Sequence, residues 1–158
     1  CHWTNNEWSW ISKKNINKSV VYKEKTTLQD IQKFISNVEK NKLKTLDFIN
    51  KEVKRKKKIF LYGASTKGNT LLQYYKLNND LIPFAVERSP EKWGKYTIGT
   101  GIKIISEAQA RKMKPDYYFV MPYAFISEFK KREKKWLAGG GRFMLPYPNF
   151  KIVKWKKL

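Results

Sequence analysis

Residues 59–68 carry the sequence IFLYGASTKG, a short apolar run that leads into a loop with a glycine at each end. The uncharged run at 59–62 is typical of a buried β-strand. Gly63 and Gly68 hold the first and third glycine positions of the dinucleotide fingerprint G-x-G-x-x-G, and Ser65 stands at the middle one. Such a loop joins a strand to a helix, where free backbone N–H groups and the helix dipole favour an anion. The stretch therefore predicts a Rossmann-like domain with a phosphate-approach loop.

Residues 69–150 alternate between short apolar runs and amphipathic stretches. The alternation predicts an α/β fold, a Rossmann-like three-layer domain whose mainly parallel sheet is covered by helices on both faces. We expect the strands at 59–62, 82–86, 102–105, 117–121 and 142–145. We expect the intervening helices at 69–77, from Ser106 with Gln109 as its capping partner, and at 124–137.

A long amphipathic helix is expected before this domain, over residues 27–55. Thr26 and Gln29 are suitable for a capping box at its start. The basic run at 54–58 suits its end, where cations complement the helix dipole. Apolar side chains recur along it at the three- and four-residue spacing of one helix face, at Leu28, Ile31, Ile35, Val38, Leu46, Ile49 and Val53.

The chain of 158 residues carries 34 basic and 13 acidic side chains, a formal net charge of +21. A field of this size attracts phosphates and nucleic acids. Phosphate and base recognition favours arginine, however, and nearly all of these basic residues are lysine. Lysine-rich usage alongside many Asn and Ile is typical of an AT-rich genome. We therefore treat nucleic-acid binding as an alternative function and not as the main one.

The sequence shows no membrane-spanning or targeting segment. No apolar run is long enough to cross a bilayer, and the first residues lack the basic start and apolar run of a signal peptide. The single cysteine, Cys1, fits a reducing compartment. We therefore expect a cytoplasmic protein without a membrane partner. Because the first residue is not Met, we also expect a piece of a longer chain.

The loop at 63–68 leaves several functions open. It almost matches a P-loop, but Asn69 stands where that motif needs its lysine, which excludes a nucleoside triphosphatase of that type. An NAD(P)-binding oxidoreductase domain remains an alternative, with Glu87 near the end of the second strand, where such folds bind a ribose hydroxyl. The two glycines could also serve only a tight turn and close helix packing.

Four blocks of the chain, in matching order and spacing, resemble the C-terminal domain of the S-adenosylmethionine-dependent C-methyltransferases that act on nucleotide-linked (dTDP) deoxysugars. The blocks are YGASTKGNTLLQYYKL (62–77), VERSPEKWGKYTIGTGIKII (86–105), SEAQARKMKPDYYFVMPYAF (106–125) and GGGRFMLPYP (139–148). Two positions depart from the family. Ala124 stands in the middle of a triplet that is commonly aromatic-Asn-Phe, and Glu87 stands where Asp is often found.

The resemblance implies an enzyme of three parts: a small metal-binding region, a central S-adenosylmethionine domain, and a C-terminal domain that helps to hold the nucleotide-sugar. The present chain would comprise the tail of the missing upstream methyltransferase domain (1–25), a connecting helix (26–58), the Rossmann-like domain (59–150) and a basic tail (151–158). It has one histidine, His2, and one cysteine, so we assign no catalytic residue and no metal ligand. We expect it to bind the nucleotide-sugar, to leave S-adenosylmethionine to the parent enzyme, and to be inactive alone.

The candidate substrate-binding residues lie on four segments. We expect the loop to hold the diphosphate, the end of the second strand to address sugar or ribose hydroxyls, the glycine-rich turn at 96–101 to close over the ligand, and two aromatic residues to stack on the base or pack in the core. The residues are Gly63, Ser65, Thr66, Lys67, Gly68 and Asn69 in the loop, Glu87 and Arg88 after the second strand, Tyr96, Thr97 and Thr100 on the turn, and Tyr123 and Phe125 after a later strand.

Overall fold

The computed structural model describes residues 27–155, except for the side chain of Lys67. The chain divides into two units, Cys1–Phe34 and Ile35–Leu158, and the sheet and its pockets belong to the second. The expected tail at 1–25, with His2 and Cys1, and the expected cap Thr26 lie outside the described residues. In the part of the chain that is described, no helix combines the length and the apolar character needed to cross a membrane.

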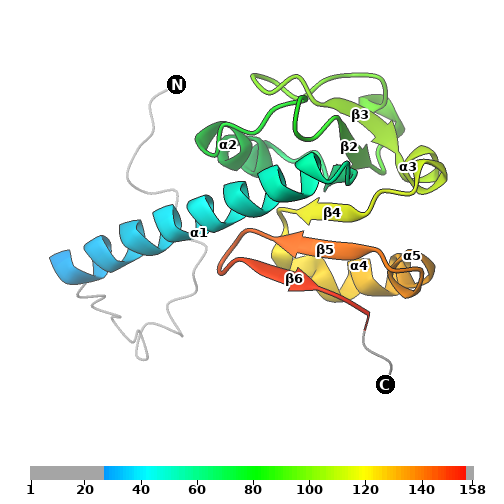
Figure 1. Ribbon diagram of the computed structural model, residues 1–158. Helices are drawn as coiled ribbons and strands as arrows, with labels where there is room; N and C mark the ends of the chain where they lie inside the picture. The colour runs from blue at the N-terminus through cyan, green and yellow to red at the C-terminus, as the bar shows by residue number, and fades with distance from the viewer. Residues whose placement is uncertain (1–26, 156–158) are drawn as a thin grey trace, which may run out of the picture. The chain divides into compact units, whose positions relative to one another are not determined.

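A six-stranded sheet forms the centre of the second unit (Figure 1). Its strands lie in the order β3-β2-β1-β4-β5-β6, with β1 to β5 parallel and β6 antiparallel to β5. The predicted α/β fold with a mainly parallel sheet is therefore confirmed. The strands are β1 (Ile59–Tyr62), β2 (Phe84–Glu87), β3 (Lys103–Ser106), β4 (Tyr117–Val120), β5 (Arg142–Leu145) and β6 (Lys151–Val153).

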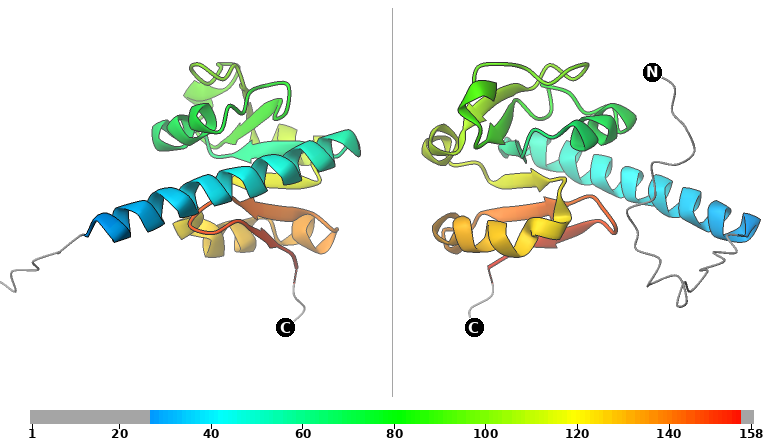
Figure 2. Two further views of the ribbon diagram at one scale, coloured as in Figure 1. Left: turned by 60° about the vertical axis from the view of Figure 1, so that its left-hand side comes forward. Right: turned by 180° about the vertical axis from the view of Figure 1, so that it is seen from behind.

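Helices cover both faces of this sheet, as the two views of Figure 2 show. The α-helices are α1 (Leu28–Lys54), α2 (Thr66–Tyr74), α3 (Glu107–Met113), α4 (Ile126–Arg132) and α5 (Lys134–Ala138), with short 3-10 helices η2 (Pro90–Lys92) and η3 (Tyr123–Phe125). The capping box predicted for the helix after Ser106 is confirmed, because Ser106 Oγ accepts from Gln109 N–H and the Gln109 side chain accepts from Ser106 N–H.

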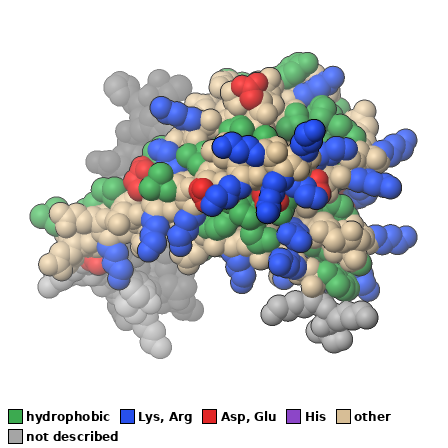
Figure 3. Space-filling model, viewed as in Figure 1, with side chains coloured by type: hydrophobic (Ala, Val, Ile, Leu, Met, Phe, Trp, Pro, Cys, Tyr) green, Lys and Arg blue, Asp and Glu red, His purple; other side chains and the backbone are tan. Residues whose placement is uncertain are grey.

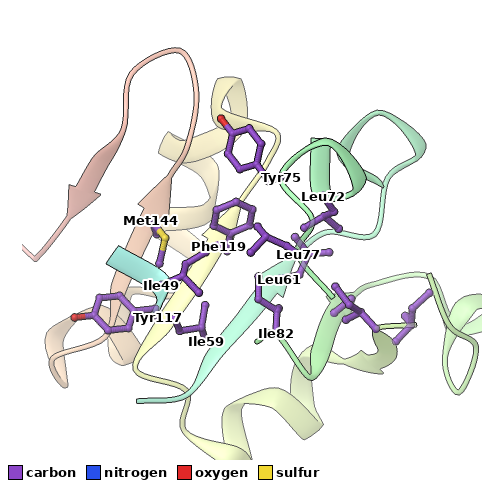
Figure 4. Packing of buried hydrophobic residues seen from close by; sticks show 13 residues of the cluster. Ile49, Ile59, Leu61, Leu72, Tyr75, Leu77, Ile82, Tyr117, Phe119 and Met144 are labelled. Carbon is purple, nitrogen blue, oxygen red and sulfur yellow. The ribbon is translucent and has the colours of Figure 1, made fainter. Parts of the chain in front are cut away.

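Two layers of core side chains follow from the alternation of side chains along each strand. Ile59 and Leu61 of β1 point to one face and pack with Ile49 of α1 and Leu72 of α2. Figure 4 shows this layer, where side chains of β1 and β4 meet those of the two helices. On the other face, Phe60 and Tyr62 pack with residues of α3, α4 and α5, namely Ala110, Phe129 and Leu137.

The helix predicted at 124–137 is interrupted. Residues 123–125 form η3, and α4 and α5 are separated at Glu133, whose side chain is only 2% exposed. Its carboxylate accepts hydrogen bonds from Tyr62 Oη (2.9 Å) and from Arg111 Nη2 (2.6 Å) and Nε (3.0 Å). A buried carboxylate needs such partners, and these come from β1 and α3. The pattern of local apolar spacing contains no sign of them.

Three expected boundaries also differ. The helix α2 begins at Thr66, three residues before the prediction, because Ser65 caps it. The capping box of α1 is formed by Thr27 and Asp30, one residue after the expected pair. Residues 151–153, expected as part of a basic tail, form the edge strand β6.

The long helix is also more than a connector. Of the stripe expected on it, Ile49 is fully buried and Leu46 and Val53 pack against the core, whereas Leu28, Ile31 and Ile35 are exposed. Asn41, Thr45 and Glu52 are buried as well. The second half of α1 therefore belongs to the core of the α/β domain, although the sequence placed the domain boundary after residue 58.

Candidate functional site

The loops after β1 and β4 leave the sheet on opposite faces. The loop after β1 leads to α2, which packs on one face, and β4 leads to α4, which packs on the other. Adjacent parallel strands whose connections diverge in this way leave a crevice at their carboxyl ends, the usual ligand position in open α/β sheets. A pocket of about 780 Å³ lies there, lined by Ser65, Thr66, Gly68, Leu71, Met121, Pro122, Tyr123, Ala124 and Tyr147. We call it the carboxyl-edge pocket.

The two loop glycines are required by geometry. Gly63 has φ +91°, a conformation that other residues rarely adopt, and its N–H donates to the Val86 carbonyl oxygen at 2.8 Å. A Cβ on Gly68 would stand 3.0 Å from Ser65 Oγ and 3.3 Å from Met121 Cβ. The absence of a side chain at 68 therefore lets the first turn of α2 approach the end of β4.

The start of α2 lines this pocket with residues that have free main-chain donors. Ser65 caps the helix, since its Oγ accepts from Gly68 N–H at 3.1 Å. Among the described residues, the N–H groups of Ser65 and Thr66 have no hydrogen-bond partner, and both residues are exposed and line the pocket. The first N–H groups of a helix lack intrahelical acceptors and carry its positive dipole end. The arrangement can therefore accept an anion.

Two aromatic residues also line the pocket. Tyr123 and Tyr147 meet edge to face with ring centroids 5.3 Å apart, and they are 39% and 43% exposed. Phe125 is 57% exposed and lies near Phe129, outside the pocket lining. The lining of the pocket thus combines the polar start of α2 with two partly exposed rings.

Glu87 is engaged within the chain. Burial opposes ionisation of its carboxyl, but three backbone N–H groups outweigh this effect and hold the pKa of Glu87 below its usual value. An ionised carboxylate offers about four acceptor sites, and four donors use them here: the N–H groups of Ala64 (3.2 Å), Arg88 (2.8 Å) and Ser89 (3.4 Å), and Lys92 Nζ (3.4 Å). A ligand hydroxyl could bind Glu87 only by displacing one of them. Arg88 itself is exposed.

The turn at 96–101 is tied to α2. Asn69 Nδ2 donates to the Ile98 carbonyl oxygen at 2.8 Å, and Thr100 Oγ1 donates to Asn69 Oδ1 at 3.3 Å. Thr97 Oγ1 and Thr100 Oγ1 are 2.6 Å apart and hydrogen-bonded. Tyr96 is 60% exposed. These four residues, expected to close over a ligand or to bind it, are absent from the lining of the carboxyl-edge pocket.

The structure therefore brings together Ser65, Thr66, Gly68 and Tyr123 of the predicted site. Sequence reasoning missed five further residues that line the same pocket: Leu71, Met121, Pro122, Ala124 and Tyr147. Tyr147 had a usable signal, because it follows the last predicted strand at the carboxyl edge, as Tyr123 follows an earlier one. In the described part of the chain, no group of three His, Cys, Asp or Glu side chains is placed to hold a metal ion.

Comparison with known proteins agrees with the resemblance found in the sequence. Residues 12–148 match the family described as the C-methyltransferase C-terminal domain. The C-methyltransferase NovU of Streptomyces niveus is 37% identical over 92 residues, which cover 58% of this chain and 22% of that protein. The chain thus spans only a small part of the length of this curated relative. It belongs to the family of C-methyltransferase C-terminal domains.

Proposed function

We propose that this domain holds the nucleotide-linked sugar substrate of an S-adenosylmethionine-dependent sugar C-methyltransferase. The observation that carries the proposal is the carboxyl-edge pocket, whose lining combines Ser65 and Thr66, with their unpartnered N–H groups, and the rings of Tyr123 and Tyr147. A nucleotide-sugar has the matching chemistry, with a diphosphate for the donors and flat or apolar rings for the aromatic wall.

The diphosphate would bind at the start of α2. Its charge would meet the positive end of the helix dipole and the two free N–H groups. The first turn of α2 contains no acidic residue and has Lys67 in its place. A cation there is unfavourable for the isolated helix by up to about 1 kcal/mol, so the sequence at this turn suits a bound anion better than a free helix end.

The base or the sugar would lie against Tyr123 and Tyr147. Leu71 and Met121 supply further apolar surface in the same pocket. Stacking of a base on an aromatic side chain contributes about 1–3 kcal/mol. These rings would therefore supply much of the affinity that the main-chain donors do not provide.

The methyl donor and the base that activates the sugar carbon would belong to other parts of the parent enzyme. When bound there, S-adenosylmethionine supplies the electrophilic methyl group. The lining of the carboxyl-edge pocket contains no carboxylate to hold the ribose hydroxyls of such a donor. The role of this domain in the reaction would therefore be to position the substrate.

Calorimetric titration with dTDP-glucose tests the proposal. We expect saturable binding that weakens about tenfold in Tyr123→Ala, for the loss of one stacked ring, and at least as much in the double variant Ser65→Leu and Lys67→Glu. Tyr96→Ala, an exposed tyrosine outside the pocket, is the matched control and should bind as the unchanged chain does. Absence of binding by the unchanged chain, or equal weakening by Tyr96→Ala, would contradict the proposal.

An NAD(P)-binding domain is the first alternative. Its usual acidic contact with a ribose hydroxyl requires a free carboxylate after the second strand, whereas all four acceptor sites of Glu87 are in use. Fluorescence titration with NADH separates the two functions, because micromolar NADH binding would favour the oxidoreductase alternative.

A further inference from the structure

The peptide groups of Ala64 are held from both sides by one pair of charged residues. Ala64 N–H donates to Glu87 Oε2 at 3.2 Å, and Lys92 Nζ donates to the Ala64 carbonyl oxygen at 3.4 Å. Lys92 Nζ also lies 3.4 Å from Glu87 Oε2. Ala64 is the residue immediately before the helix cap Ser65, so these contacts act on the loop that lines the carboxyl-edge pocket.

We infer that Glu87 and Lys92 are positioning residues that fix the direction of the Ser65 N–H, and that neither is a ligand contact. This inference rests on the proposed role of the loop in binding a diphosphate. The Ala64 carbonyl and the Ser65 N–H belong to one planar trans peptide group, in which they point in opposite directions. A cation that holds the carbonyl on one side therefore directs the N–H to the other.

The direction of this peptide decides the sign of the charge that the loop presents. With the carbonyl turned to Lys92, the loop offers a donor on the opposite side. After a peptide flip, a carbonyl oxygen would take that place and would repel a phosphate. Holding the donor in place before the ligand arrives removes an ordering cost from binding.

The Glu87 carboxylate is firmly placed, whereas the Lys92 side chain is 43% exposed. The Glu87 side chain is 17% exposed, and its second oxygen accepts from Arg88 and Ser89 N–H. The indole Nε1 of Trp93 donates to the Glu87 carbonyl oxygen at 2.9 Å, which ties η2, with Lys92, to the end of β2. Every acceptor site of the carboxylate is thus used to hold the chain.

The test compares Glu87→Gln and Lys92→Met with Lys95→Met, which removes one charge from an exposed lysine three residues further along. Exchange of the Ala64 amide hydrogen, followed by NMR without ligand, is the first readout, because the Ala64 N–H is bonded to Glu87. We expect this exchange to speed up about tenfold in Glu87→Gln, which weakens the acceptor, and in Lys92→Met, which releases the Ala64 carbonyl and the Glu87 carboxylate, and to stay unchanged in the control. Lys92→Arg, which keeps a cationic donor, should restore protection. Unchanged exchange in both variants would overturn the inference.

The second readout is affinity for inorganic pyrophosphate and for dTDP-glucose. If the pair positions the loop, both ligands should lose affinity by the same factor. If Glu87 contacts a sugar or ribose hydroxyl, dTDP-glucose alone should lose affinity, and the inference is wrong. If the unchanged chain binds neither ligand, the proposed function fails, while the exchange experiment still decides whether the pair holds the Ala64 peptide.

Discussion

The two edges of the sheet present different chemistry. Among the described side chains, those that line the carboxyl-edge pocket carry no charge. At the amino edge, where β4 and β5 begin, a second pocket of about 590 Å³ is lined by four basic residues, Arg111, Lys114, Arg132 and Lys135, and by two acidic ones, Asp116 and Glu133. In Figure 3, Lys and Arg side chains are spread over the visible face, and several of them project from its right-hand end.

This difference indicates that the large positive charge is not concentrated where the substrate is proposed to bind. Basic residues at the amino edge follow the C-terminal turns of α1 and α3, where cations complement the helix dipole. The proposed attraction of the carboxyl edge for a diphosphate depends instead on main-chain donors. Variants at matched positions of the two edges test this difference.

The largest expected effect is on stability at the amino edge. A Cβ at the buried Gly141 would collide with the Trp136 ring, whose own packing against Tyr118 and Phe143 leaves it little room to move. We expect Gly141→Ala to lower the free energy of unfolding by about 3 kcal/mol, the upper range for overpacking, without changing the affinity of the folded protein for dTDP-glucose. Urea unfolding and titration measure the two quantities. Gly139→Ala, whose Cβ would make only ordinary contacts at 3.5 Å, is the control.

At the carboxyl edge, Gly68→Ala should lower both the free energy of unfolding and the affinity for dTDP-glucose. Its Cβ would press on Ser65 Oγ and Met121, so we expect a loss of about 1–3 kcal/mol of stability together with a tenfold or greater loss of affinity, because the helix cap moves. The same two measurements apply. Equal ligand affinity in Gly68→Ala and Gly141→Ala would remove the distinction between the edges.

Acidification should weaken the amino edge through Asp116. Burial opposes ionisation of its carboxyl, but the Lys58 N–H and the Lys57 ammonium outweigh it and hold the pKa of Asp116 below its usual value. A lowered pKa means that the stabilisation is complete above the unfolded-state pKa of about 3.9 and is lost as the pH falls through the folded-state value. We expect Asp116→Asn to cost about 1 kcal/mol at pH 7 and much less at pH 3, by urea unfolding. Asp47→Asn, in an exposed pair with Lys51, should change stability by less than about 0.5 kcal/mol at either pH.

The smallest expected effect is that of amino-edge charge on the pocket at the other edge. A four-residue strand spans about 13 Å, which exceeds the Debye length of about 8 Å at physiological salt. Lys56→Glu with Lys114→Glu should therefore change the affinity for dTDP-glucose less than about twofold at ~150 mM salt. A gel shift at the same salt tests the nucleic-acid alternative: sequence-selective retention that these two changes abolish would favour it.

Most of the architecture could be predicted because it is written in short-range patterns. The strand Ile59–Tyr62 was predicted at its observed bounds, and the other four parallel strands were placed within two residues, since buried strands need apolar runs and turns need glycine or proline. The edge strand β6 was missed. It has three residues and a lysine at its start, which gives too short a pattern for a strand assignment.

The pocket was predictable only in part. Ser65, Thr66, Gly68 and Tyr123 follow from the rule that ligands bind beyond the carboxyl ends of parallel strands. The separation of Asn69, Thr97 and Thr100 from the pocket lining did not follow from it. Asn69 is hydrogen-bonded to Ile98 and to Thr100, which lie 29 and 31 residues further along the chain. Local spacing does not predict contacts between such distant segments.

The sequence by itself determined the order of strands and helices along the chain, the glycine loop and the resemblance to C-methyltransferase C-terminal domains, because each is carried by short stretches of residues that are neighbours in the chain. Only the tertiary structure decided that the Glu87 carboxylate accepts hydrogen bonds from its own chain, that α4 and α5 are separated at the buried Glu133, and that the second half of α1 packs in the core. Each of these depends on groups from other strands and helices, and the sheet order that brings those groups together is a property of the whole fold.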